Sequence, residues 1–174
     1  WDDTLFPTTE FWKKSKPISL ENLYKWGSRV FKLLKLYIDV FGSDNIYIIT
    51  NGDDGWIQQS LQMVTEQFQL LNNWRSPFEP FLCNYFMAID ALIKLNEIKT
   101  ISARSLYQSQ FPNPNHSKIW KQLTFIYYAI QHFWDNNEGV IISIGDSVDE
   151  WFASKNCQQF FMNLNNNKNK NNSF

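Results

Sequence analysis

The chain has 174 residues, a formal net charge of −1, 44% hydrophobic residues and 19% charged residues. This length suits one domain with a real core, since a chain of ~150 residues buries roughly two-thirds of its unfolded surface. The near-neutral charge argues against a nucleic-acid partner or an anionic membrane surface, and no apolar run approaches the ~20 residues that span a bilayer. Two cysteines and two histidines exclude a disulfide framework and a multi-histidine metal site, so we expect a reducing compartment, the cytoplasm.

The spacing of apolar residues along the chain predicts several helices, and the short apolar runs between them are predicted strands. A helix over 20–41 follows Ser19 and ends at Gly42. Asn45 to Thr50 is an apolar run without polar alternation, which is typical of a strand buried on both faces of a parallel sheet. The remaining elements are helices over 56–71, 81–95, 117–134 and about 149–161, strands over 97–102 and 139–144, and loops around Pro77 and Pro80 and over 110–115.

Strands that alternate with helices of this length favour an α/β fold with a parallel sheet flanked by helices. We expect one core domain over 1–162, followed by an Asn-rich tail over 163–174 that is disordered because it cannot bury enough apolar surface. In parallel sheets, ligands bind beyond the carboxyl ends of the strands. The polar residues at those ends are therefore the candidates for a site: Thr50 with Asn51, Ser102 with Arg104, and Asp146 with Asp149 and Glu150.

Four short motifs, taken together and in this order, resemble those of the haloacid-dehalogenase-like hydrolases. Asp2-Asp3-Thr4 resembles the end of the first motif, Asp-x-Asp-x-Thr, and the apolar run that ends at Thr50 resembles the second. The third motif is a lysine near a helix start, for which Lys121 is the candidate and Lys118 the alternative. The fourth is an apolar strand followed by Gly145-Asp146 and by an acidic residue, Glu150.

The resemblance implies a Rossmann-like three-layer sandwich with little or no cap domain, similar to a poorly characterised eukaryotic branch of the family. In the first motif, Asp2 would be the second Asp, so the nucleophilic Asp and the central strand would precede Trp1. We therefore expect the 174 residues alone to be inactive and poorly stable. An open cleft without a cap suits a large phosphorylated substrate, such as a phosphoprotein or a nucleic-acid end.

The same resemblance implies a Mg²⁺-dependent phosphatase that acts through an aspartyl-phosphate. Asp2 would protonate the leaving oxygen and then take a proton from water. Thr50, with the amides of Asn51 or Gly52, would hold phosphoryl oxygens, and Lys121 would neutralise their charge.

Three further residues complete the implied site. Asp146, together with the nucleophile and the carbonyl of Asp2, would bind Mg²⁺. Glu150, or Asp149 in its place, would orient metal-bound water or Lys121. Arg104 is a candidate contact to the substrate phosphate, although a loop arginine is more often a surface charge.

Each motif also has a plainer interpretation. Asp2 and Asp3 could belong to a turn, Lys121 could be a solvated helix residue, and the run from 145 to 150 could simply cap the last helix. The alternative function is a non-catalytic phosphatase-like module that binds a partner or a phosphorylated ligand. A receiver domain shares the α/β pattern, but it is shorter and its lysine follows a late strand.

Overall fold

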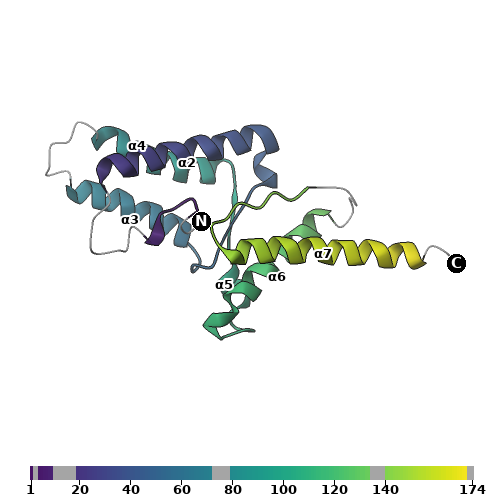
Figure 1. Cartoon of the computed structure of the whole chain (residues 1–174). Helices are drawn as coiled ribbons and strands as arrows, with labels where there is room; N and C mark the ends of the chain where they lie inside the picture. Colours follow the sequence, from purple (N-terminus) through teal and green to yellow (C-terminus); the bar gives the residue numbers. More distant parts are fainter. Residues whose placement is uncertain (2–3, 10–18, 72–78, 134–139, 172–174) are drawn as a thin grey trace. The chain divides into compact units, whose positions relative to one another are not determined.

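The computed structural model describes residues 1, 4–9, 19–71, 79–133 and 140–171 (Figure 1). These residues are mostly helical and include a small parallel sheet of two strands, an α/β arrangement. The sequence predicted one domain over 1–162, whereas the structure groups the chain into two compact units. The first unit comprises residues 1–48 and 54–101, and the second comprises residues 49–53 and 102–174.

The first unit contains α2 (Leu20–Phe41), α3 (Trp56–Leu71) and α4 (Glu79–Leu95), and α4 packs against both of the others (Figure 1). The first two helices have the predicted bounds. The Ser19 hydroxyl accepts the Asn22 N–H at 3.2 Å, and Gly42 leaves the helix with φ 77°. The third begins before its predicted start at 81, because a proline at 80 is tolerated in the first turn of a helix.

Aromatic side chains fill the core of the first unit. Trp26 stacks on Phe86 with 5.4 Å between ring centroids and meets Phe6 edge-on at 5.5 Å. Gly27 allows this close approach of α2 to α4, since a Cβ at this position would lie 3.3 Å from the Cβ of Tyr85. At the chain start, the buried indole N–H of Trp1 donates to the Ser60 hydroxyl at 2.9 Å.

The sheet consists of β1 (Tyr47–Thr50) and β2 (Lys99–Ser102), both shorter than predicted. A 3₁₀ turn, η1 (Ser43–Asn45), precedes β1 in the chain. Burial alternates along β1, with Ile48 and Thr50 buried and their neighbours partly exposed, so the prediction of a strand buried on both faces is wrong. The face of β1 that carries Tyr47 and Ile49 is only partly covered.

The third strand predicted over 139–144 is not a strand in the described residues. Val140 to Ile144 belong to neither a helix nor a strand, and the side chain of Val140 is 83% exposed. Residue 139 lies outside the described part of the chain. The β-branched composition favours an extended backbone, but a strand also needs a neighbour to receive its hydrogen bonds. The result is a run of exposed apolar side chains: Val140, Ile141, Ile142 and Ile144.

The second unit contains α5 (Ala103–Tyr107), the 3₁₀ turn η2 (Pro114–His116), α6 (Ser117–Phe133) and α7 (Val148–Asn171). The turn η2 falls in the segment predicted as a loop. The two long helices pack against each other and bury Ala129, Ala153 and Cys157. Trp134, the predicted end of α6, lies outside the described residues.

The last helix is longer at both ends than the predicted span of 149–161. It continues to Asn171, so the structure has helix through most of the segment predicted to be a disordered tail. Once a helix has begun on a packed surface, each further residue adds one backbone hydrogen bond, and the weak propensity of Asn costs little per residue.

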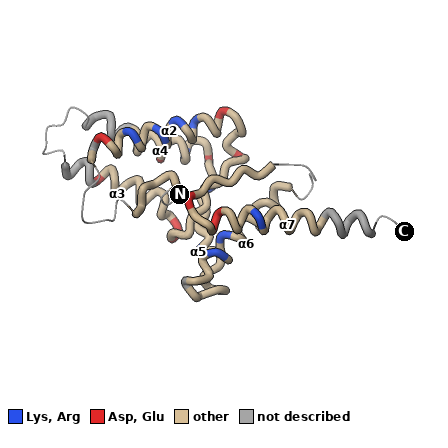
Figure 2. The backbone as a smooth tube through the Cα atoms, in the orientation of Figure 1, with Lys and Arg blue, Asp and Glu red and all other residues tan. Residues whose placement is uncertain are grey.

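Lysine and arginine follow one another on the exposed side of α2, with acidic residues near both helix ends (Figure 2). These basic residues are Lys25, Arg29, Lys32 and Lys35. Among the described helices, none is long and apolar enough to cross a membrane.

Candidate functional site

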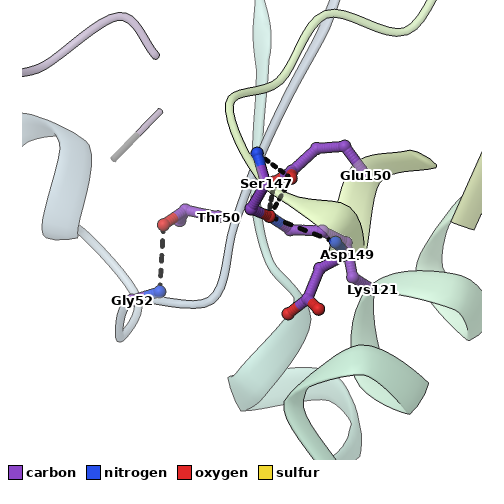
Figure 3. Close-up of polar contacts among 6 residues, drawn as sticks. All are labelled: Thr50, Gly52, Lys121, Ser147, Asp149 and Glu150. Carbon is purple, nitrogen blue, oxygen red and sulfur yellow. Dashed lines mark hydrogen bonds and ion pairs between the residues drawn. The ribbon is translucent and has the colours of Figure 1, made fainter. Parts of the chain in front are cut away.

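The loop after β1 is held by two polar contacts. Thr50 is buried at the end of the strand, and its hydroxyl accepts the N–H of Gly52 at 2.9 Å (Figure 3). The carbonyl of Gly52 accepts the Ser102 hydroxyl at 2.6 Å, and the same hydroxyl accepts the N–H of Ser105 at 2.9 Å at the start of α5. The loop after the first strand is thereby fixed to the residue that ends the second. The Gly52 amide, predicted to hold a phosphoryl oxygen, donates to Thr50 instead.

Two more predicted residues belong to this loop and to α5. The guanidinium of Arg104 forms an ion pair of 3.3 Å with Asp53 and lies 6.0 Å from the ring centroid of Trp120. Its Nε is buried without a hydrogen-bond partner, as is the side-chain oxygen of Asn51. Both atoms therefore carry an unmet hydrogen-bonding need, which costs folding free energy until a ligand or water supplies it.

Lys121 is a buried lysine on α6, and it forms an ion pair with Glu150 of α7. The two side chains are only 9% and 14% exposed. The alternative candidate, Lys118, is exposed one turn earlier, and its ammonium lies 6.0 Å from the ring of Phe152. An isolated buried ammonium is very unfavourable, and the ion pair with the Glu150 carboxylate offsets part of this cost.

Glu150 also caps its own helix. Oε2 accepts the Ser147 backbone N–H at 3.2 Å and the Ser147 hydroxyl, while that hydroxyl accepts the Asp149 N–H at 3.2 Å (Figure 3). This is the reciprocal geometry of a capping box, in which Ser is followed three residues later by Glu. The interpretation of this run as a helix cap is therefore confirmed, and its interpretation as part of a site stays a prediction. The cap holds the carboxylate of Glu150 in place, and this carboxylate forms the ion pair with the ammonium of Lys121.

Gly145 is required by the way Glu150 folds back. A Cβ on Gly145 would lie 2.6 Å from the Cβ and 2.7 Å from the Cδ of Glu150, closer than real atoms approach. Burial alone would raise the pKa of Glu150, but the hydrogen bonds from Lys121 and Ser147 and the charge of Lys121 together lower it below its usual value. The carboxylate is therefore held in its ionised form.

The predicted metal ligands are only partly brought together. Within the described residues, no group of three or more His, Cys, Asp or Glu side chains is placed to hold a metal ion, and Asp2 lies outside those residues. Asp146 stands on the exposed segment before α7 and offers the carboxylate oxygens that Mg²⁺ prefers. Glu150 does not fit as a direct ligand, because Lys121 bonds one of its oxygens and Ser147 the other. Its arrangement fits the role of orienting Lys121.

Sequence reasoning included Ser147 only in a run that could cap the last helix, and it missed Asp53 and Trp120. Ser147 carried a usable signal, since Ser-x-x-Glu before a helix is the pattern of a capping box. Asp53 and Trp120 carried none, because their partner Arg104 is distant from each of them along the chain. Comparison of the chain with family models, curated proteins and solved structures found no match.

Proposed function

We propose that the protein is a phosphatase-like hydrolase of the haloacid-dehalogenase kind, with Lys121 as the positive charge that neutralises the phosphoryl oxygens. The observation that carries the proposal is the buried Lys121–Glu150 ion pair, fixed by the cap at Ser147. An ammonium has three N–H donors, so Lys121 can keep its bond to Glu150 and still donate to phosphoryl oxygens. An ion pair that served only to stabilise the fold would not need to be held in place by a helix cap beside the loop at the end of a strand. Replacing a buried ion pair with apolar residues is often neutral or stabilising.

Thr50 and the loop after it provide the second part of the proposed site. The hydroxyl that accepts the Gly52 N–H is oriented by that bond, and we assign it the donation of its hydrogen to a phosphoryl oxygen. Asp2 would serve as the acid that protonates the leaving oxygen, and the Asp proposed to precede Trp1 would form the aspartyl-phosphate. Mg²⁺, when bound, would neutralise phosphoryl charge, and Asp146 would hold it.

The three-layer sandwich is part of the same proposal. Val140 to Ile144 are apolar and exposed, which supports their assignment as a third strand that pairs with a strand carrying the first motif. Hydrogen exchange in the full-length natural protein tests this. Slow exchange of the amides of 140–144 is expected, and exchange as fast as in an unfolded chain would contradict the assignment.

The catalytic proposal is tested by turnover of p-nitrophenyl phosphate by the full-length natural protein, with and without Mg²⁺. Lys121→Met should reduce kcat/KM by about a hundredfold or more, the range for losing one transition-state charge contact. Lys118→Met is the matched control and should leave turnover unchanged, because Lys118 is exposed. Absence of turnover across a broad panel of phosphoesters would refute the enzyme.

The alternative is a non-catalytic phosphate-binding module. The bonds that already occupy both oxygens of Glu150 and the Gly52 amide favour it, since the site is largely satisfied from within. In that case, calorimetry would detect binding of a phosphopeptide that depends on Lys121, but no phosphoester would be hydrolysed. The residue before Trp1 in the parent protein separates the two: Asp supports the enzyme, and Asn, Gly or Ser supports the module.

A further inference from the structure

Arg104 is a charged residue of the second unit whose contacts leave a buried donor without a hydrogen-bond partner. It lies in the first turn of α5, directly after the strand that Ser102 ends. Its guanidinium is placed from two sides, by the ring of Trp120 and by the carboxylate of Asp53. Its Nε is nevertheless buried without a partner.

The partner that Arg104 does have is a weak one. The contact to Asp53 is a single bond of 3.3 Å, and the two side chains are 38% and 77% exposed. Exposed ion pairs of this kind contribute little to stability. An arginine is best satisfied when Nε and a terminal nitrogen together bind both oxygens of one anion, which this contact does not achieve. The contact with Asp53 shows that a carboxylate can reach this guanidinium, and the Asp53 side chain is itself mostly exposed.

We propose that Arg104 determines specificity by binding a carboxylate of the substrate, so that the protein prefers phosphorylated ligands that also carry a nearby carboxylate. The inference rests on the proposed phosphate site at Thr50 and Lys121. Asp53, the partner of Arg104, stands three residues after Thr50, and the backbone between them spans at most about 10 Å, so one short loop carries both Thr50 and the carboxylate that Arg104 contacts. The Asp53 carboxylate occupies the position of the substrate carboxylate until the ligand displaces it.

Two sources of such a carboxylate fit, and matched pairs of ligands separate them. One pair is a phosphoserine peptide with Glu beside the phosphoserine and the same peptide with Gln. The other pair is 3-phosphoglycerate and glycerol 3-phosphate, which differ in the carboxylate alone. Binding to the full-length natural protein is measured by calorimetry, which needs no turnover.

We expect the carboxylate-bearing member of at least one pair to bind about ten- to a hundredfold more tightly, the range for one charge-assisted contact. Arg104→Gln should reduce this ratio to about one. Asp53→Asn should tighten binding of the carboxylate-bearing ligand, because it removes the competitor; a merely structural ion pair gives no such gain. Arg29→Gln on α2 is the control.

Each remaining outcome decides the matter. Equal affinity within both pairs, or an Arg104→Gln variant that weakens both members alike, would overturn the assignment of Arg104 while leaving the phosphatase proposal intact. No binding of any of the four ligands would overturn the assignment too, and turnover of p-nitrophenyl phosphate would then show whether the phosphatase proposal survives on its own.

Discussion

Removing one partner of the Lys121–Glu150 ion pair should cost far more folding free energy than removing one partner of an exposed ion pair among the described residues. Glu150→Gln keeps the shape of the side chain but removes the charge that offsets the buried ammonium. Losing one partner of a buried pair costs roughly 3–5 kcal/mol. Because both side chains keep about a tenth of their surface exposed, we expect the lower end, about 3 kcal/mol. In a chain of this size, that lowers Tm by about 6–12 °C.

A double-mutant cycle isolates the pair from other effects. Urea unfolding of the wild type, Lys121→Met, Glu150→Gln and the double variant should give a coupling energy of about 2 kcal/mol. The matched control is the Glu21–Lys25 pair on α2, which is 2.6 Å long but has side chains 66% and 56% exposed. Its coupling should stay below about 0.5 kcal/mol. A coupling of that small size for Lys121 and Glu150 would refute the reasoning, and with it the placing of Lys121 by Glu150.

Four further predictions follow from single contacts. Gly145→Ala should cost about 1–3 kcal/mol in urea unfolding, because its Cβ would overlap Glu150, and an unchanged midpoint would contradict that contact. Folding lowers the pKa of Glu150, so the stability that its carboxylate contributes is complete above the unfolded pKa of about 4.3 and is lost as the pH falls through the lower folded pKa. The urea midpoints of the wild type and Glu150→Gln, measured from pH 7 to 3, should therefore converge only below about pH 4. Burial raises the pKa of the Cys157 thiol to about 11, so iodoacetamide at pH 7.5 should label this thiol only in urea. Peptide mass spectrometry can measure the labelling, and rapid labelling of the folded protein would argue against a buried thiol. Ser60→Ala removes the acceptor of the buried Trp1 indole and should cost about 1–3 kcal/mol, with a loss under about 0.5 kcal/mol as the contrary result.

The helices were predictable because their ends are marked locally. Ser19 and Gly42 bound α2 in the sequence and act as its cap and its stop in the structure. The strand predicted over 139–144 failed because pairing depends on a neighbour, and an apolar β-branched run reads the same whether or not that neighbour is present. A helix forms its backbone hydrogen bonds within its own segment, so the local sequence pattern is enough to predict it. A strand forms them with another segment, so its own pattern is not enough.

The site residues divide in the same way. Lys121 could be named from its place on a helix, but its burial depends on a carboxylate 29 residues later in the chain. Arg104 and Asp53 are 51 residues apart in the chain, so no local spacing of residues indicates their contact. Ser147 was readable from four adjacent residues and could have been assigned.

The exposed run from Val140 to Ile144 has a consequence for how the protein is made. A short β-branched window without charge or proline is the kind of segment that pairs with copies of itself. It leaves the ribosome after the residues of α2 to α6 have been synthesised, and earlier parts of a chain begin to fold first. This segment therefore spends less time in the nascent state than the helices that precede it, which limits its encounters with neighbouring nascent chains on the same message.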